Sequence, residues 1–123
     1  KETHVGLLPT WGDSYGYSVL ESQAAGCPMI TTDLRALTEI NDDQIGWNIK
    51  VPQLANKNGD IKTSDKRKMF ANEIEINLEK IILAILANPA VIEEKGKLSL
   101  EKIQKMHNVK IVKKALKNIY STV

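Results

Sequence analysis

Cysteine is nearly absent from this 123-residue chain, which contains only Cys27. One cysteine cannot form an internal disulfide, so nothing indicates an oxidising compartment, and we expect a reduced, cytoplasmic setting. No apolar run is long enough to cross a bilayer, and the first residues show no signal-type segment, so we expect a soluble chain. Because Lys1-Glu2-Thr3-His4 lead directly into an apolar run, we also expect the chain to be part of something longer. His4 and His107 stand far apart with no further ligand at metal spacing, so we expect no metal site.

A strong excess of one charge is also lacking. The 17 basic and 15 acidic residues leave a formal net charge of +2, so we expect no nucleic-acid partner. An apolar share of 42% and a charged share of 26% argue against disorder and against a fibrous scaffold. The length suits one core, so we expect a single unit over residues 1–123, with an α/β core over 1–88 and C-terminal helices over 89–123.

The first part of the chain has the pattern of a strand, a loop, a helix and a second strand. Residues 4–9 are an apolar run that predicts a strand buried on both faces of a parallel sheet. Residues 10–16 predict a loop, residues 18–25 a helix that stops at a glycine, and residues 28–32 a second buried strand. Such a crossover makes the strands parallel and puts the loop at the carboxyl end of a strand, where these sheets bind ligands.

A third strand and a long helix follow. Residues 47–51 predict the strand, residues 54–63 an exposed polar loop, and Ser64-Asp65 the cap of a helix that ends near residue 87. The helix has one apolar face, formed by Phe70, Ile74, Leu78, Ile81, Ile82, Ile85 and Leu86. Together these segments predict an α/β fold in which a short parallel sheet is flanked by helices.

Asn88-Pro89 breaks the long helix, and amphipathic helices are predicted over residues 98–106 and 109–120. The last helix has lysines along one face, Lys110, Lys113, Lys114 and Lys117. A basic amphipathic helix can touch an acidic membrane, but the apolar side lacks large aromatic residues, so we interpret the lysines as a solvated face and expect no membrane partner.

Two acidic residues flank the start of the first helix. Asp13 lies in the loop, and Glu21 follows eight positions later, inside the helix. The first N–H groups of a helix and its dipole favour an anion such as a diphosphate, and Gly16 lets a ligand approach the backbone closely. A carboxylate can accept hydrogen bonds from sugar hydroxyls. This combination indicates a sugar nucleotide.

The same segment resembles the signature of the large retaining glycosyltransferase family called group one, which has the two-domain GT-B fold and two acidic residues separated by seven others. Asp13 matches the first acid and Glu21 the second. The further matches in and after the helix are Gly16, Val19, Leu20, Ala25, Gly26, Pro28 and Ile30. A weaker resemblance continues through Ala36–Ile40 to the closing helix.

The resemblance implies a role for each residue of the signature. Glu21 would contact the ribose and Asp13 the transferred sugar, and both are therefore the expected catalytic residues. Backbone contacts to the sugar and diphosphate would come from Ser14, Tyr15, Gly16, Tyr17 and Ser18. The donor would be a UDP-, GDP- or ADP-sugar, with no cofactor and no metal.

The chain departs from the family at two positions. Asp13 is one methylene shorter than the usual glutamate, and Leu34-Arg35-Ala36 stands where many relatives have adjacent glycines. The family's phosphate-binding Arg and Lys and its acceptor site belong to segments that precede this one. The resemblance therefore implies the later half of a Rossmann-like domain, a partner in the missing N-terminal domain, and a hexosyltransferase that is inactive as this chain alone.

Other interpretations stay open. The chain could be part of a sugar-nucleotide epimerase of the same fold, or a non-catalytic binding or assembly module, and a bare sheet edge would favour homo-oligomers. Trp11, Tyr15 and Tyr17 either stack on a base or sugar or pack locally around the loop. Cys27 has no nearby histidine or cation cluster, so we expect it to serve packing.

Overall fold

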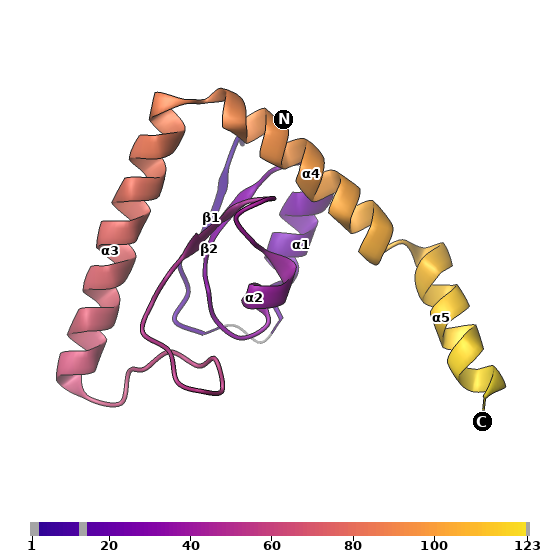
Figure 1. Ribbon diagram of the computed structural model, residues 1–123, viewed down its shortest axis with the longest axis horizontal. Coiled ribbons are helices and arrows are strands. Elements are labelled where there is room, and N and C mark those ends of the chain that lie inside the picture. The colour runs from indigo at the N-terminus through magenta and orange to yellow at the C-terminus, as the bar shows by residue number, and fades with distance from the viewer. Residues whose placement is uncertain (1–2, 13–14, 123) are drawn as a thin grey trace.

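The computed structural model describes residues 3–12 and 15–122, which form a mixed α/β fold (Figure 1). Its strands in this part of the chain are β1 (Gly6–Leu8), β2 (Met29–Thr32) and β3 (Trp47–Ile49), and its helices are α1 (Tyr17–Ala24), α2 (Leu37–Ile40), α3 (Ser64–Ala87), α4 (Ala90–Met106) and α5 (Val109–Ser121). The strands pair in parallel in the order β1-β2-β3. The predicted short parallel sheet flanked by helices is confirmed.

The sheet has a buried centre and an open edge. All four residues of β2 are buried, as predicted. β1 differs from its prediction, because Leu7 is 51% exposed and the strand is therefore not buried on both faces. Its sequence is apolar enough for a central strand, but β1 pairs with β2 alone and lies at the edge of the sheet.

The core has one layer on each face of the sheet, because successive side chains of a strand point to opposite faces. Met29 of β2 packs against α1 and α2 on one face. The next residue, Ile30, packs with Ile49 of β3 and Ile85 of α3 on the other face. Figure 1 shows the result, with α1 and α3 on opposite sides of the strands.

α3 spans the predicted helix, but its cap is one residue earlier than expected. The side chain of Thr63, rather than that of Ser64 or Asp65, accepts a hydrogen bond of 3.1 Å from the N–H of Lys66. A threonine hydroxyl at this position satisfies one of the first N–H groups of the helix. The acidic Asp65 in the first turn complements the positive end of the helix dipole.

The predicted apolar face of α3 is buried only in part. Phe70 is fully buried and Ile85 is 8% exposed, whereas Ile82 and Leu86 are 41% and 68% exposed. A helix of 24 residues is about 36 Å long, while the strands that it covers have only three or four residues, or about 10–13 Å. The sheet is therefore too small to cover the whole apolar surface of α3.

α4 begins at Ala90, earlier than the predicted residue 98. Pro89 takes the N-cap position, where its lack of an N–H costs nothing. A glycine inside the helix allows α4 to cross closely over the end of α1, since a side-chain carbon on Gly96 would lie 2.5 Å from the carbonyl oxygen of Gly26. The close packing therefore explains why a glycine stands at position 96, in the middle of α4.

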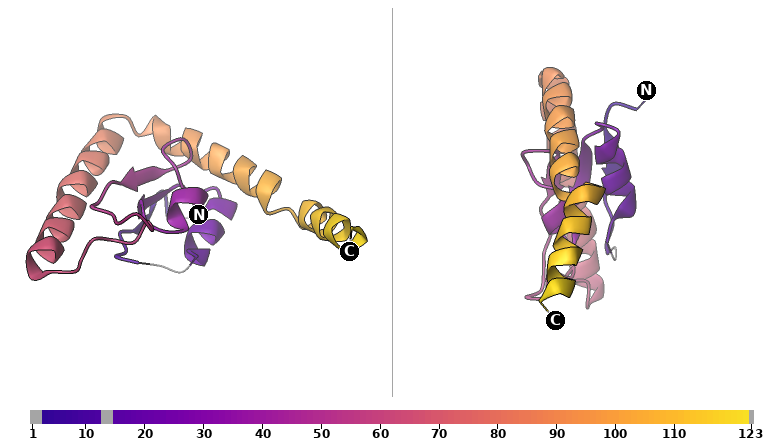
Figure 2. Two further views of the ribbon diagram at one scale, coloured as in Figure 1. Left: turned by 60° about the horizontal axis from the view of Figure 1, so that its bottom comes forward. Right: turned by 90° about the vertical axis from the view of Figure 1, so that its right-hand side faces the viewer.

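α5 extends past the end of α4 and away from the sheet (Figure 2). It has no buried residue, and Leu116 and Ile119 of its apolar face are 48% and 59% exposed. Within the described residues, no helix is both long enough and apolar enough to cross a membrane.

Candidate functional site

The segments that follow the three strands meet at the carboxyl edge of the sheet, the lower edge in Figure 1. The hydroxyl of Thr32, at the end of β2, donates a hydrogen bond of 2.6 Å to the carbonyl oxygen of Thr10, after β1. The N–H of Arg35 donates to the carbonyl oxygen of Lys57, after β3, at 3.0 Å. The segment after β1 thus lies where the sequence analysis expected it.

α1 starts at this edge with a glycine cap. Gly16 has a φ of 80°, and no side chain caps the helix. The N–H groups of Val19 and Leu20 both donate to the carbonyl oxygen of Gly16, at 3.0 and 3.3 Å. The N–H groups of Tyr17 and Ser18 lie in the first turn and have no acceptor inside the helix, so they can serve an anion.

Glu21 lies on the same side of α1 as the two residues that begin the helix. It follows Tyr17 by four positions and Ser18 by three, which places all three side chains on one face. All three are exposed, whereas Val19 and Gln23 on the opposite face are buried. The helix therefore presents the carboxylate of Glu21 and the hydroxyl of Ser18 on one exposed face.

Two of the predicted site residues, Asp13 and Ser14, lie outside the described residues. The predicted pairing of Asp13 with Glu21 therefore stays a prediction.

Gly16 has a packing role that the sequence did not reveal. A side-chain carbon at this position would lie 2.6 Å from Cδ2 of Leu37 and 2.9 Å from Cδ1 of Ile40, both in α2. Gly16 is buried, and its positive φ is one that residues with a side chain rarely adopt. The turn before α1 requires glycine because α2 packs directly against it.

The three aromatic residues near the loop contact other rings. The ring of Trp11 lies 5.0 Å from that of Phe70 in α3, tilted by 56°. The rings of Tyr15 and Tyr17 lie 5.1 Å apart, tilted by 41°. Tyr17 is still 69% exposed and Trp11 is 40% exposed. Local packing therefore holds these rings in place while leaving part of each surface open.

Two cations at this edge were not assigned a function from the sequence. Arg35 was noted only as a departure from the family's adjacent glycines, and Lys57 stands in a loop with no motif. In the structure both have a positive φ, 47° and 62°. A side-chain carbon on Gly12 would lie 3.6 Å from Cζ of Arg35, so this guanidinium lies against the loop before α1. The signal that could have revealed Arg35 is a charged residue at a place where the resembled family often has adjacent glycines.

A third cation at the edge is paired. Nζ of Lys50 lies 2.8 Å from Oδ2 of Asp33, and this hydrogen-bonded carboxylate raises the pKa of Lys50. The main-chain carbonyl of Asp33 also accepts a hydrogen bond from the side chain of Gln53. The pair therefore links the segments after β2 and β3 and leaves Lys50 less able to serve a ligand.

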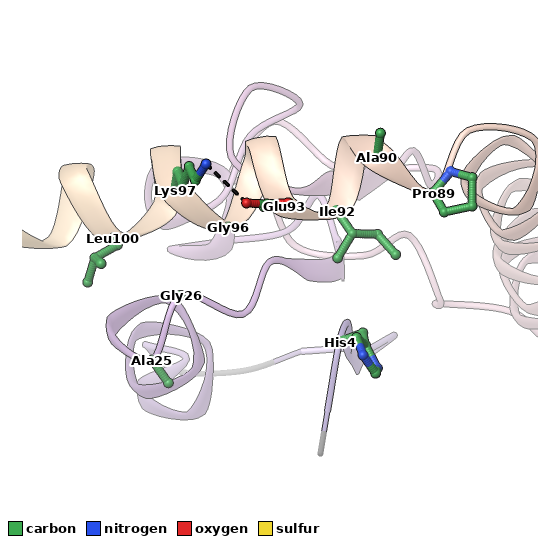
Figure 3. A pocket seen from close by; sticks show the side chains of 10 residues that line it. All are labelled: His4, Ala25, Gly26, Pro89, Ala90, Ile92, Glu93, Gly96, Lys97 and Leu100. Atoms are coloured by element: carbon green, nitrogen blue, oxygen red, sulfur yellow. Dashed lines mark ion pairs between the residues drawn. The ribbon is translucent and has the colours of Figure 1, made fainter. Parts of the chain in front are cut away.

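A cavity lies at the opposite edge of the sheet (Figure 3). It has a volume of about 600 Å³ and lies between α4, the end of α1 and the approach to β1. Its lining is mostly apolar, and its charged residues Glu93 and Lys97 form an ion pair of 3.1 Å with each other. We therefore place the candidate site at the carboxyl edge and interpret this cavity as a gap in packing.

No group of three or more His, Cys, Asp or Glu side chains in the described residues could hold a metal ion. The edge instead offers helix N–H groups, the carboxylate of Glu21 and the cations Arg35 and Lys57, which can bind a ligand that is both anionic and rich in hydroxyls. No protein-family model, no curated protein and no solved structure matches this chain.

Proposed function

We propose that this chain is the nucleotide-sugar-binding part of a retaining glycosyltransferase with the GT-B fold. The observation that carries the proposal is the position of Glu21, on an exposed face of α1 four residues after the start of this helix, which begins at the carboxyl edge of a parallel sheet. In this proposal the diphosphate of a UDP-, GDP- or ADP-sugar lies at the start of α1. Glu21 accepts hydrogen bonds from the ribose, and Asp13 contacts the transferred sugar.

The proposal includes a fold assignment, the later half of a Rossmann-like domain. The sequential parallel order of the strands supports it, because one half of such a domain consists of neighbouring strands added in chain order. The exposure of Leu7 supports it as well, since a further strand beside β1 and the helix that connects it would cover this side chain. We propose that segments before β1 supply that strand, the acceptor site and the remaining catalytic groups, and that the chain alone is inactive.

A titration tests the proposal. The chain is titrated with UDP, GDP and ADP and with their glucose and mannose conjugates, beside a Glu21→Gln variant that keeps the size of the side chain. Loss of a charged hydrogen bond predicts a roughly tenfold or larger fall in affinity for the preferred nucleotide. Glu94→Gln, an exposed glutamate of α4, is the matched control and should bind like the wild type. Equal binding by both variants would contradict the proposal.

A second candidate function is an assembly module without catalysis, and α5 is the observation that favours it. The apolar residues of this helix occupy one side about 180° wide, and none of them is buried. If this face binds a partner or a second copy, Leu116→Asp abolishes the association in analytical ultracentrifugation and leaves nucleotide binding intact. A monomeric wild-type chain that binds nucleotide would argue against this second function.

A further inference from the structure

We propose that Arg35 and Lys57 form a phosphate-binding pair, which takes the diphosphate of the donor if the proposed function is correct. Both cations stand at the carboxyl edge of the sheet, and both side chains are exposed. The Arg35 guanidinium lies against Gly12, two residues after Thr10, in the segment that leads from β1 to α1. It therefore lies beside the loop that leads to α1, the helix that the nucleotide-sugar proposal uses.

The two cations are held in place by neutral partners. Nε of Arg35 donates a hydrogen bond to Oδ1 of Asn58, and Nζ of Lys57 donates to Oγ1 of Thr38 at 3.2 Å. The same Thr38 hydroxyl donates to the carbonyl oxygen of Arg35 at 2.8 Å, and the N–H of Arg35 donates to the carbonyl oxygen of Lys57. These bonds fix both residues to each other without neutralising their charges.

Two carboxylates of the segments around Arg35 and Lys57 are already paired with other lysines. Asp33 lies 2.8 Å from the ammonium of Lys50, and Asp60 lies 2.9 Å from that of Lys66. Within the described residues, neither Arg35 nor Lys57 forms an ion pair. Two positive charges that form no ion pair within the described residues therefore stand beside the loop that leads to α1.

The chemistry of the two side chains suits a diphosphate. A guanidinium can donate two parallel hydrogen bonds to one phosphate, and within the described residues the Arg35 side chain donates through Nε alone. A lysine ammonium acts as a point charge that can reach a second phosphate. The backbone at both residues has the left-handed conformation, φ 47° and 62°, in which a glycine would be less strained.

The probe for this site is inorganic pyrophosphate, which has no nucleoside and so does not depend on Glu21. We expect the wild-type chain to bind it in low salt, Arg35→Gln to weaken binding roughly tenfold or more, and Lys57→Gln to weaken it several-fold. Arg35→Lys, which keeps the charge, should retain part of the affinity. Lys117→Gln removes one charge from the distant α5 and should change nothing. Thermal unfolding checks that each variant is folded.

The outcomes separate this inference from the proposed function. If pyrophosphate binding falls in Arg35→Gln while no nucleotide binds in a Glu21-dependent way, the anion pair is supported and the nucleotide-sugar proposal fails. If nucleotide binding depends on Glu21 but neither Arg35→Gln nor Lys57→Gln weakens nucleotide or pyrophosphate binding, the anion pair is overturned and the proposed function stands. A wild-type chain that does not bind millimolar pyrophosphate also overturns it.

Discussion

The hydroxyl of Thr32 donates a hydrogen bond of 2.6 Å to the main-chain carbonyl of Thr10. The donor stands at the end of the central strand, and the acceptor opens the segment that leads to α1. This bond fixes the start of the candidate site to the most buried strand of the sheet.

Replacing Thr32 by valine should therefore destabilise the protein. The substitution keeps the shape of a fully buried side chain and leaves the Thr10 carbonyl without its donor, which costs about 1–2 kcal/mol. Urea unfolding measures the loss. Thr122→Val, which removes an exposed hydroxyl bonded to the carbonyl of Ile119, is the control and should stay within about 0.5 kcal/mol of the wild type.

Gly16→Ala should destabilise the protein more strongly. Alanine would adopt an unfavourable positive φ and would bring its methyl group within 2.6 Å of Leu37 and 2.9 Å of Ile40. Together the strain and the overpacking cost about 2–4 kcal/mol. Gly12→Ala is the matched control, because the nearest atom to a methyl there is Cζ of Arg35 at an ordinary 3.6 Å. Equal thermal stabilities of the two variants would contradict the packing role of Gly16.

Gly96→Ala tests whether packing or helix propensity dominates in α4. Alanine is favoured over glycine inside a helix by about 1 kcal/mol. Here its methyl group would lie 2.5 Å from the carbonyl oxygen of Gly26, so we expect a net loss of about 1–3 kcal/mol. Chemical denaturation shows whether the substitution raises or lowers the free energy of unfolding. A stabilised Gly96→Ala would mean that α4 does not press against the end of α1. Glu94→Ala, at an exposed position of the same helix, should have little effect.

The Lys50–Asp33 pair should make a small, pH-dependent contribution to the free energy of unfolding. The pKa of Lys50 is raised in the folded protein, so its contribution is fully present below the ordinary value of 10.5 and is lost as the pH rises through the folded value. Because the Lys50 side chain is 68% exposed, solvent screening limits the contribution to about 0.2–1 kcal/mol.

A double-mutant cycle with Lys50→Met and Asp33→Asn measures the coupling between these two side chains. The coupling should be present at pH 8, fall in high salt and disappear in strongly alkaline solution. A coupling that persists when Lys50 is neutral would show that the pair is not held by charge.

Local pattern was enough to predict the elements around the site. The helix over residues 18–25 and the strand over 28–32 correspond to α1 and β2, because apolar spacing, a terminal glycine and a short turn act over a few residues. A strand–helix–strand crossover then fixes the parallel direction, which is why the loop could be placed at the carboxyl edge. The prediction for α4 was wrong at its start, since a glycine inside a helix is justified only by the neighbour that it contacts.

The sequence by itself determined the α/β class and the parallel direction of β1 and β2. Only the tertiary structure decided that Leu7 lies at an open edge, that Gly16 packs on α2, and that Arg35 and Lys57 stand beside the loop before α1. The physical reason is the separation along the sequence between the residues that each effect involves. Periodicity and turn chemistry depend on neighbours in sequence, whereas burial and the meeting of charges from separate loops depend on which segments the folded sheet brings together.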